Sequence, residues 1–307
     1  MISKKNQKKI SIKKINILSK HLKKKIKADL KNITKKKKLK NLNLDSLPII
    51  MGVLNITPDS FSDGGQYNQY NLAKRQMENL FKSGANLVDI GGESTRPGSK
   101  SISSKIEWNR IKKILKIINK NKMLSLDTRK SEIMEKGIKL GVKLINDVSG
   151  LSYDKNTINV LKRYKTPFVL QHSGGNPDVM QKNPKYKNVL LDIYDFFEKK
   201  IKLLRKIGIN HDNIILDPGI GFGKNLKHNM ILIKNISIYH SLGFPILLGI
   251  SRKKFIKELS LENDSSSRIG GTISSCIFGM MQGVQIFRVH DVNEINQSIK
   301  VFNELNK

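Results

Sequence analysis

The sequence predicts an eight-stranded α/β barrel, because three regularities are typical of that fold. Eight short apolar runs alternate with segments of helical periodicity from residue 48 onwards. This alternation occupies about 260 residues, close to the roughly 250 of a typical (β/α)8 barrel. Nearly every run ends in polar or charged side chains, as expected where parallel strands share one mouth. A doubly wound open sheet is the alternative architecture.

Each apolar run is short enough for a strand that is buried on both faces, the usual state of strands in a parallel sheet. The runs are PIIMGVL, ANLVDI, KMLSL, VKLI, PFVL, NIIL, FPILLGI and VQIFRV. Helices are predicted over Leu72 to Phe81, Ile106 to Ile118, Glu132 to Leu140, Val189 to Ile207, Leu226 to Tyr239, Ile269 to Met281 and, last, Val292 to Leu305. Residues 47–307 are therefore expected to form one catalytic domain.

Residues 1–46 form a Lys-rich extension, expected to be disordered or partly helical and to lie outside the fold. Residues 1–47 contain 17 Lys and two Asp, a net +15 out of the formal +32 of the whole chain. Arg and aromatic side chains, which read and stack on bases, do not cluster with these Lys. Nucleic acid is therefore an unlikely partner, and a basic nucleic-acid-binding protein is only an alternative interpretation.

The cysteine count and the lengths of the apolar runs exclude several other classes of protein. The only cysteine, Cys276, rules out an intrachain disulfide and a multi-thiolate metal site. No apolar run approaches the 18 or so residues of a membrane span, and the N-terminus lacks the apolar stretch of a secretory signal. We expect a soluble, cytoplasmic protein.

The stretch MGVLNITPDSFSDGG, residues 51–65, is predicted to be a buried strand that opens into a polar loop. The strand ends at Asn55, whose amide can both donate and accept hydrogen bonds. A turn signal and two glycines follow, with Phe61 as a large apolar side chain among polar neighbours. We interpret this loop as a lid over the site.

Two further loops indicate the kind of ligand. GGESTRPG, from Gly91 to Gly98, offers the Thr95 hydroxyl and the planar Arg96 guanidinium, so an anionic substrate is implied. LDPGIGFGK, from Leu216 to Lys224, fails the Walker pattern because Pro218 and Asn225 occupy required positions. We expect Asp217 to point into the mouth and its carboxylate to accept two hydrogen bonds from an NH and NH2 edge.

Asp127 and Asn146 would complete a recognition set around one polar heterocycle, a pterin or a purine. The same carboxylates could instead form a metal cluster or a glycosidase pair. Ser251 follows the seventh strand and Arg288 and His290 lie on the eighth, where this fold usually binds phosphate. Arg288 and His290 could stabilise a departing pyrophosphate.

With these residues assembled, the chain strongly resembles dihydropteroate synthases, the pterin-binding (β/α)8 enzymes of folate biosynthesis. The resemblance runs from about Leu44 to the C-terminus and rests on MGVLNITPDSFSDGG, DIGGESTRPG, LDTRK, INDVSG, HSGGNPDVMQ, LDPGIGFGKN, SRK and RVHDV. It implies condensation of 6-hydroxymethyl-7,8-dihydropterin diphosphate with 4-aminobenzoate, which gives 7,8-dihydropteroate and pyrophosphate. A methyltetrahydrofolate-binding methyltransferase domain is the nearest alternative, although it would have no use for STRPG and SRK.

The resemblance also assigns roles to residues. Its catalytic group would be Asp127, Lys253, Arg288 and His290. The pterin would be held by Asp127, Asn146, Asp217 and Lys253, the diphosphate by Thr95, Arg288 and His290, and its Mg²⁺ by Asn55. The aminobenzoate, and sulfonamide inhibitors in its place, would contact Phe61, Arg96, Pro97, Phe222, Ser251 and Lys253. The family further implies a homodimer, through the apolar helix Ile269 to Met281.

One segment departs from the family pattern. The fifth strand continues into QHSGGNP, where many members have MHMQGNP. Gln171, Ser173 and Gly174 therefore replace two Met and a Gln in the expected wall of the pterin pocket.

Overall fold

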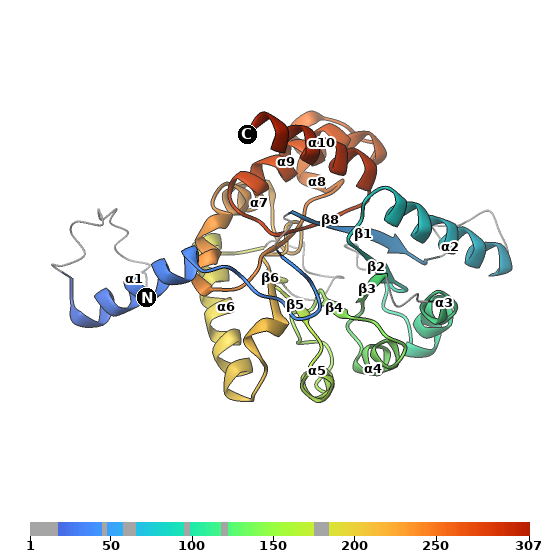
Figure 1. The fold of residues 1–307 in the computed structure, drawn as a ribbon, viewed down its shortest axis with the longest axis horizontal. Helices are drawn as coiled ribbons and strands as arrows, with labels where there is room; N and C mark the ends of the chain where they lie inside the picture. The colour runs from blue at the N-terminus through green and yellow to red at the C-terminus, as the bar shows by residue number, and fades with distance from the viewer. Residues whose placement is uncertain (1–17, 45–47, 58–65, 95–98, 118–121, 175–183) are drawn as a thin grey trace.

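The structure, a computed structural model, describes residues 18–44, 48–57, 66–94, 99–117, 122–174 and 184–307. Within these ranges eight parallel strands stand at the centre and helices surround them (Figure 1), which confirms the predicted barrel. The strands are β1 Ile49–Asn55, β2 Leu87–Gly91, β3 Met123–Asp127, β4 Leu144–Asp147, β5 Phe168–Gln171, β6 Ile214–Asp217, β7 Leu247–Gly249 and β8 Ile286–Val289.

The strands follow the order β6-β5-β4-β3-β2-β1-β8-β7, so that β1 lies between β2 and β8. The remaining seam, between β6 and β7, is joined by a parallel bridge from Leu216 to Ile246. The Leu216 amide donates to the carbonyl of Pro245 at 2.9 Å. The sheet is thus nearly closed into a ring, and the carboxyl ends of its strands meet at one mouth.

The helices follow the predicted alternation, with two additions after strands β4 and β7. They are α1 Lys20–Thr34, α2 Gln66–Lys82, α3 Ser104–Lys116, α4 Ser131–Lys139, α5 Thr157–Tyr164, α6 Val189–Lys206, α7 Leu226–Lys234, α8 Lys254–Ser260, α9 Ile269–Met281 and α10 Val292–Leu305. The described residues also include the 3₁₀ helices η3 His211–Asn213, η4 Ile236–Leu242 and η5 Ser266–Arg268. The single helix predicted from Leu226 to Tyr239 is divided at Asn235 into α7 and η4.

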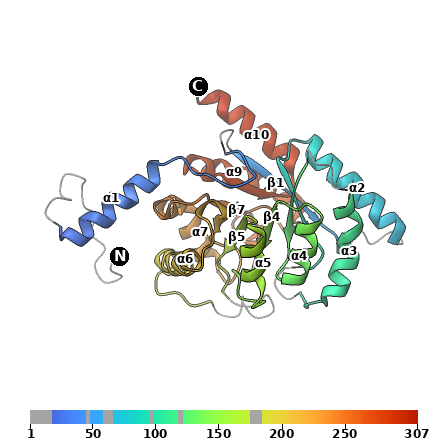
Figure 2. The ribbon, with the colours of Figure 1, turned by 60° about the horizontal axis from the view of Figure 1, so that its bottom comes forward.

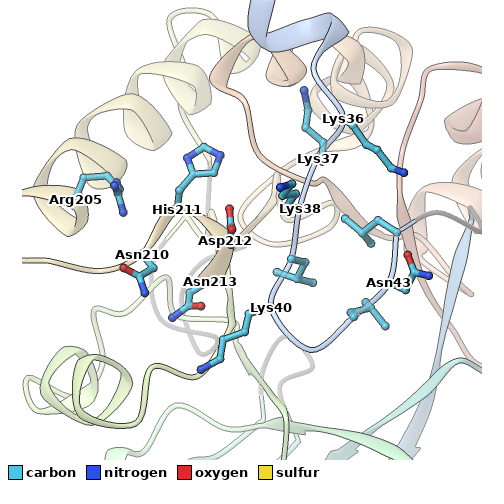
Figure 3. Close-up of a pocket in the computed structure, with 13 residues that line it drawn as sticks. Lys36, Lys37, Lys38, Lys40, Asn43, Arg205, Asn210, His211, Asp212 and Asn213 are labelled. Carbon is cyan, nitrogen blue, oxygen red and sulfur yellow. The ribbon is translucent and has the colours of Figure 1, made fainter.

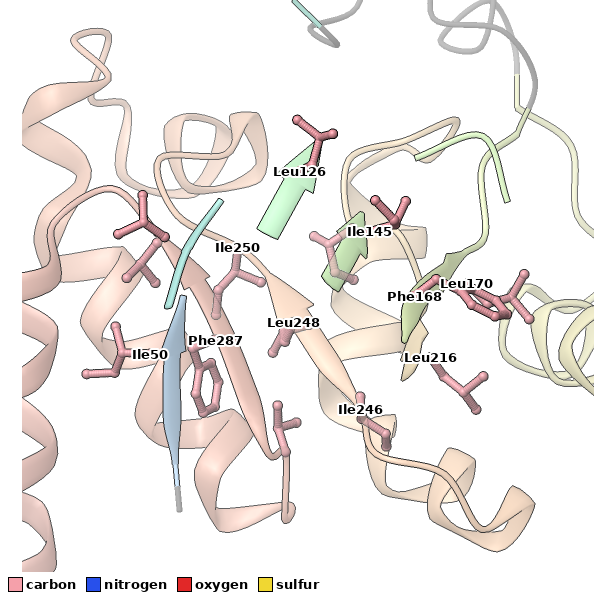
Figure 4. Close-up of a cluster of buried hydrophobic side chains, with 14 of the residues drawn as sticks. Ile50, Leu126, Ile145, Phe168, Leu170, Leu216, Ile246, Leu248, Ile250 and Phe287 are labelled. Atoms are coloured by element: carbon pink, nitrogen blue, oxygen red, sulfur yellow. The ribbon is translucent and has the colours of Figure 1, made fainter. Parts of the chain in front are cut away.

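Alternation along the strands separates two layers of apolar side chains. Outward residues pack against the helices; Figure 4 shows part of this layer, with Ile50, Leu248 and Phe287 on neighbouring strands β1, β7 and β8. Inward residues at the amino ends of the strands, such as Ile49 and Met51, form a separate apolar cluster inside the barrel. Polar residues replace these inward side chains toward the carboxyl ends, and they build the mouth.

The Lys-rich extension packs on the barrel over its described part. Helix α1 lies on the side of the barrel that carries α6 (Figure 2). Lys25 pairs with Glu198 of α6 at 2.8 Å, and the Asn32 amide donates to the Ser241 carbonyl of η4 at 2.9 Å. Leu39 and Leu44, each 7% exposed, join the apolar cluster at the amino ends of the strands. The expectation of a solvated segment outside the fold is therefore wrong for these residues, because they close the floor of the barrel.

Candidate active site

A cavity of about 740 Å³ opens at the carboxyl ends of the strands and brings together most of the residues predicted from the sequence. Its lining includes Asn55, Asn146, Asp217, Phe222, Ser251, Lys253, Arg288 and His290. Asp127 lies against this lining through its ion pair with Arg288. Phe61, Thr95, Arg96 and Pro97 lie outside the described residues.

One guanidinium holds two buried carboxylates together at the centre of the site. Arg288 donates from Nε to Oδ2 of Asp89 at 2.7 Å and from Nη2 to Oδ2 of Asp127 at 2.9 Å. Burial raises the pKa of Asp127 to about 8, with Arg288 opposing the shift and Asp89 adding to it. Burial alone would lower the pKa of Arg288, but Asp89 and Asp127 outweigh it and raise that pKa.

The wall of the cavity presents hydrogen-bond acceptors. Oδ1 of Asp127 and Oδ1 of Asn146 are buried, and neither has a partner among the described residues. Asp217 is 4% exposed and accepts from the Gly219 amide at 2.7 Å, while burial raises its pKa to about 6. Buried acceptors without donors are costly, so this wall fits a flat ligand with N–H groups along its edge.

The loop after β6 requires glycine because of a close approach of two backbones. A Cβ on Gly219 (φ +68°) would lie 2.0 Å from the carbonyl oxygen of His172. Further along this loop, the Phe222 ring lies 4.2 Å from the Lys253 Nζ. Burial and the nearby Arg288 lower the pKa of Lys253 to about 8, against the attraction of Asp217. The loop thus supplies an apolar surface directly beside a cation.

Lys224 is a site residue that the sequence analysis did not single out. It is 3% exposed, and its Nζ donates to the Phe222 carbonyl at 2.8 Å and contacts His172 Nδ1 at 3.1 Å. Burial lowers the pKa of Lys224 to about 7, and burial with the Lys224 charge lowers the pKa of His172 to about 3. His172 is therefore a neutral acceptor for Lys224, which ties the loops after β5 and β6 together.

The end of β8 is held by the loop after β7. The Ser251 hydroxyl accepts from the His290 main-chain amide at 3.2 Å and lies 3.0 Å from His290 Nδ1. Burial and the charge of Arg288 lower the pKa of His290 to about 3, so the ring is neutral. In the tautomer in which the Ser251 hydroxyl donates to Nδ1, Nε2 carries the N–H of the ring. Arg252 in turn pairs with Asp291, from Nε to Oδ2 at 2.9 Å.

A buried ion network lies under the loop after β2. Oε1 of Glu93 accepts from the Ile102 amide at 2.9 Å, and so spans the two ends of the loop that carries Thr95. Arg129 and Lys130 pair with Glu93 at 3.0 and 2.9 Å. Although burial favours the neutral acid, the bonds from Ile102 and Lys130 lower the pKa of Glu93.

The departure from the family pattern after β5 has a local explanation at one of its three positions. A Cβ on Gly174 would lie 2.9 Å from the Gly223 Cα and 3.2 Å from its carbonyl oxygen, so a longer side chain would displace the backbone there. Gln171 lines the cavity, and its amide donates to the Val148 carbonyl at 3.5 Å. The structure does not explain Ser173.

The expected magnesium ligand, Asn55, ends β1 and lines the cavity. Among the described residues, no three His, Cys, Asp or Glu side chains gather as a metal site. One amide oxygen at the mouth suits a Mg²⁺ ion that takes most of its ligands from substrate phosphate and water. The donor set therefore fits a metal carried in with a diphosphate.

A second hollow, of about 650 Å³, lies at the opposite end of the barrel between the Lys-rich extension and η3. Its cations do not converge on one point: Lys37 donates to the Asn32 carbonyl and Lys40 to the Lys165 carbonyl at 2.8 Å (Figure 3). Arg205 likewise donates to the Ile209 carbonyl. The convergent polar groups are thus those of the mouth.

Within the described part of the chain, no helix combines the length and apolarity of a membrane span.

Comparison with known proteins gives a single family. Residues 51–290 match the model of the pterin binding enzymes. The dihydropteroate synthase of Escherichia coli (strain K12) is 38% identical over 258 residues, which cover 83% of this chain and 91% of the relative.

Solved structures agree with the sequence match. A Xanthomonas albilineans dihydropteroate synthase with 4-aminobenzoic acid is 32% identical with a TM-score of 0.81, over 86% of this chain and 95% of that one. The Yersinia pestis dihydropteroate synthase with a sulfonamide drug is 36% identical with a TM-score of 0.80, over 86% and 96%.

Proposed function

The chain belongs to the pterin-binding enzyme family, and we infer that its mouth carries out the dihydropteroate synthase reaction of folate biosynthesis. It joins 6-hydroxymethyl-7,8-dihydropterin diphosphate to 4-aminobenzoate and releases pyrophosphate. The observation that carries this conclusion is the pairing of two walls. Asn146 lines the cavity, and its buried Oδ1, like that of Asp127 behind Arg288, has no partner among the described residues. Arg288 and His290 line the same cavity and would be donors to a diphosphate.

The pterin ring is held by its hydrogen-bond donors. Asp217 accepts from the NH and NH2 edge, and Asp127 and Asn146 supply the further acceptors. The polar side chains of Lys253 and Asp217 enclose the flat pterin ring. The ring lies against the glycines of the loop after β6. An analogue without N–H groups would leave these oxygens unpaired, so the same set provides specificity.

Charge stabilisation is the main catalytic requirement. The bond between the pterin methylene carbon and the diphosphate oxygen breaks first, and both electrons leave with the pyrophosphate. Arg288 and the Nε2 proton of His290 stabilise the negative charge on the leaving group. Asp127, as a carboxylate, stabilises the positive charge left on the pterin, and this charge favours its ionised form. No strong base is needed for the attack of a neutral aromatic amine.

The 4-aminobenzoate lies on the Phe222 side of the pocket in this proposal. Its ring packs on Phe222, and Lys253 and Ser251 contact its carboxylate end. Phe61, Arg96 and Pro97 are expected to complete this subsite, where a sulfonamide would take the place of the aminobenzoate. The amine nitrogen forms its bond to the methylene carbon and then loses a proton to solvent.

In this proposal Asn55 would be the residue that holds Mg²⁺, and Thr95 would contact the phosphate oxygens. The bound metal would neutralise part of the charge on the leaving pyrophosphate. Asn55 supports this role through its carbonyl oxygen at the end of β1 and its place in the cavity lining.

We propose a homodimer that forms through α9 and α10. Phe278 and Met281 on α9 are 42% and 70% exposed, and Val301 and Leu305 on the neighbouring α10 are 55% and 80% exposed. Large apolar side chains exposed on two helices that contact each other support an interface at this face. Residues 47–307 are the catalytic domain of each subunit.

We place the reaction in the cytoplasm, because a charged diphosphate substrate does not cross a bilayer unaided.

Substrate-omission assays test the function. Pyrophosphate release should require the pterin diphosphate, 4-aminobenzoate and Mg²⁺ together, with one dihydropteroate formed per pyrophosphate. Release at the background rate with all three present would refute the proposed function.

A further inference from the structure

We propose that Asp89 is a positioning residue, which sets the hydrogen-bonding face of the pterin pocket from beneath it. This inference rests on the proposed function. Asp89 is fully buried on β2 and does not line the cavity. Direct contact with a ligand therefore does not explain why a charged side chain is buried at this position.

Strand register places Asp89 one layer below the mouth. Asp89 pairs in register with Val53 and Ser125, two residues before the level of Asn55 and Asp127. Since successive inward side chains are two residues apart, Asp89 lies between the apolar floor of the barrel and the acceptor wall of the site. Asn146 pairs in register with Asp127 and can therefore reach Asp89 from the layer above.

One carboxylate oxygen of Asp89 accepts hydrogen bonds from two residues of the site. Its Oδ2 accepts from Nδ2 of Asn146 at 2.9 Å and from Nε of Arg288 at 2.7 Å. Asn146 belongs to the pterin side of the site and Arg288 to the diphosphate side. Asp89 thus links the two substrate-binding walls through one carboxylate.

The chemistry of the amide gives this bond a consequence. Only the nitrogen of an amide can donate to a carboxylate, so the bond to Asp89 fixes which way Asn146 is turned. Its Oδ1 is then directed elsewhere, and this buried oxygen has no partner among the described residues. Asn146 is therefore held as an acceptor for a ring N–H, rather than as a donor.

The same carboxylate restrains Arg288. With Nε on Asp89 and Nη2 on Asp127, the guanidinium plane is fixed by two charge-assisted bonds. A buried carboxylate that served only to fill space would be unfavourable in this position, since an apolar residue would pack beside Val53 without desolvation. Positioning of Asn146 and Arg288 explains why the chain has Asp here.

A double-mutant cycle separates positioning from general structural support. Calorimetry with 6-hydroxymethylpterin, the ring without its diphosphate, measures the affinity of the wild type, Asp89→Asn, Asn146→Ala and the double variant. Each single variant should bind about tenfold more weakly, and the double variant should be nearly the same as either, because Asp89 acts through Asn146. Losses that multiply to about a hundredfold, or wild-type affinity in Asp89→Asn, would overturn the inference.

Asp147 provides the matched control. It is also fully buried at a strand end, but its Oδ1 accepts from the amide and hydroxyl of Ser149 at 2.8 and 2.6 Å. Asp147→Asn combined with Asn146→Ala should therefore give additive effects. Coupling as strong as that of Asp89 would count against the proposal.

Two further measurements keep the outcomes distinct. If Asp89→Asn does not fold, as judged by circular dichroism, Asp89→Ser takes its place in the cycle, because it removes the carboxylate without adding an amide. Failure of the proposed function appears separately, as a wild type that releases no pyrophosphate. A wild type that is active and shows no coupling refutes only the role of Asp89.

Discussion

Single side chains in this site are tuned by burial as much as by their partners. Asp127 has an arginine 2.9 Å away and still has its pKa raised to about 8, because desolvation exceeds the attraction. Lys253 and Lys224 shift in the opposite direction for the same reason. A positive charge beside Asp127 would lower its pKa again and favour the carboxylate, the form that the proposed stabilisation of a cationic pterin requires.

Lys253 is expected to act on both substrates. Lys253→Ala should lower kcat/KM about 100-fold, because it removes one cationic side chain that contacts both the pterin and the aminobenzoate carboxylate. Lys257→Ala, on the exposed side of α8, is the matched control and should leave kcat/KM unchanged. Steady-state kinetics with each substrate varied in turn would contradict the assignment if Lys253→Ala kept the wild-type kcat/KM.

His172 makes stability depend on pH. Its folded pKa is about 3 against 6.5 in the unfolded chain, so the unfolded state binds more protons between these values. The contribution of neutral His172 is present above pH 6.5 and is lost as the pH falls toward 3. His172→Gln should therefore show a smaller fall in Tm between pH 7 and pH 4.5 than the wild type.

Thermal melts at these two pH values check the sign of that prediction. His21→Gln, at an exposed position on α1, should keep the wild-type pH dependence. An equal fall in Tm for the wild type and His172→Gln would show that His172 does not contribute.

Elements were predicted well where one physical signal dominates. The eight strands follow from runs such as Ile49 to Leu54, since a strand buried on both faces has little freedom of composition. Helix α8 was missed because seven residues give too few turns for a periodic pattern, and α5 is only one residue longer. The break at Asn235 has no glycine or proline to indicate it.

The site was predicted less completely, for a related reason. Residues at strand ends, such as Asp217 and Arg288, could be inferred from their position. The position of Asp89 follows from the same pattern, but its contact with Asn146 and the contact of Lys224 with His172 could not be inferred, because both form across the barrel. A lysine in the sequence looks like a surface residue until the fold buries it.

The pairing of α9 with α10 leads to a prediction about assembly. Phe278→Glu should shift the sedimentation of the protein toward that of a monomer, since a charge in an apolar interface is costly. Leu203→Glu, on α6 and 52% exposed, is the matched control and should leave sedimentation unchanged. A Phe278→Glu variant that sediments as the wild type does would rule out α9 as the interface.

The whole molecule has its polar chemistry at one end of the barrel and an apolar floor at the other. The sequence suggested a solvated extension because Leu39 and Leu44 are scattered among lysines. Only the topology shows that both leucines reach the cluster of Ile49 and Met51 inside the barrel. The extension is part of the structure of the barrel over residues 39–44.

Truncation of these leucines tests that arrangement. Leu39→Ala and Leu44→Ala should each lower the free energy of unfolding by about 2 to 3 kcal/mol, as expected for a buried leucine. Leu30→Ala, at a position 39% exposed on α1, should cost less. Urea denaturation measures the difference, and kcat should be unaffected because the floor is remote from the mouth. Unchanged stability in both buried variants would mean that the leucines do not support the floor.

The central claim is that the mouth recognises a pterin by accepting hydrogen bonds from its N–H edge, and Asp217→Asn tests this most directly. The amide keeps the size of the carboxylate but places an N–H where an acceptor is needed. Calorimetric titration with 6-hydroxymethylpterin should show binding to the wild type and an affinity about 100-fold lower for Asp217→Asn. Equal affinity of the two proteins for this ligand would contradict the account.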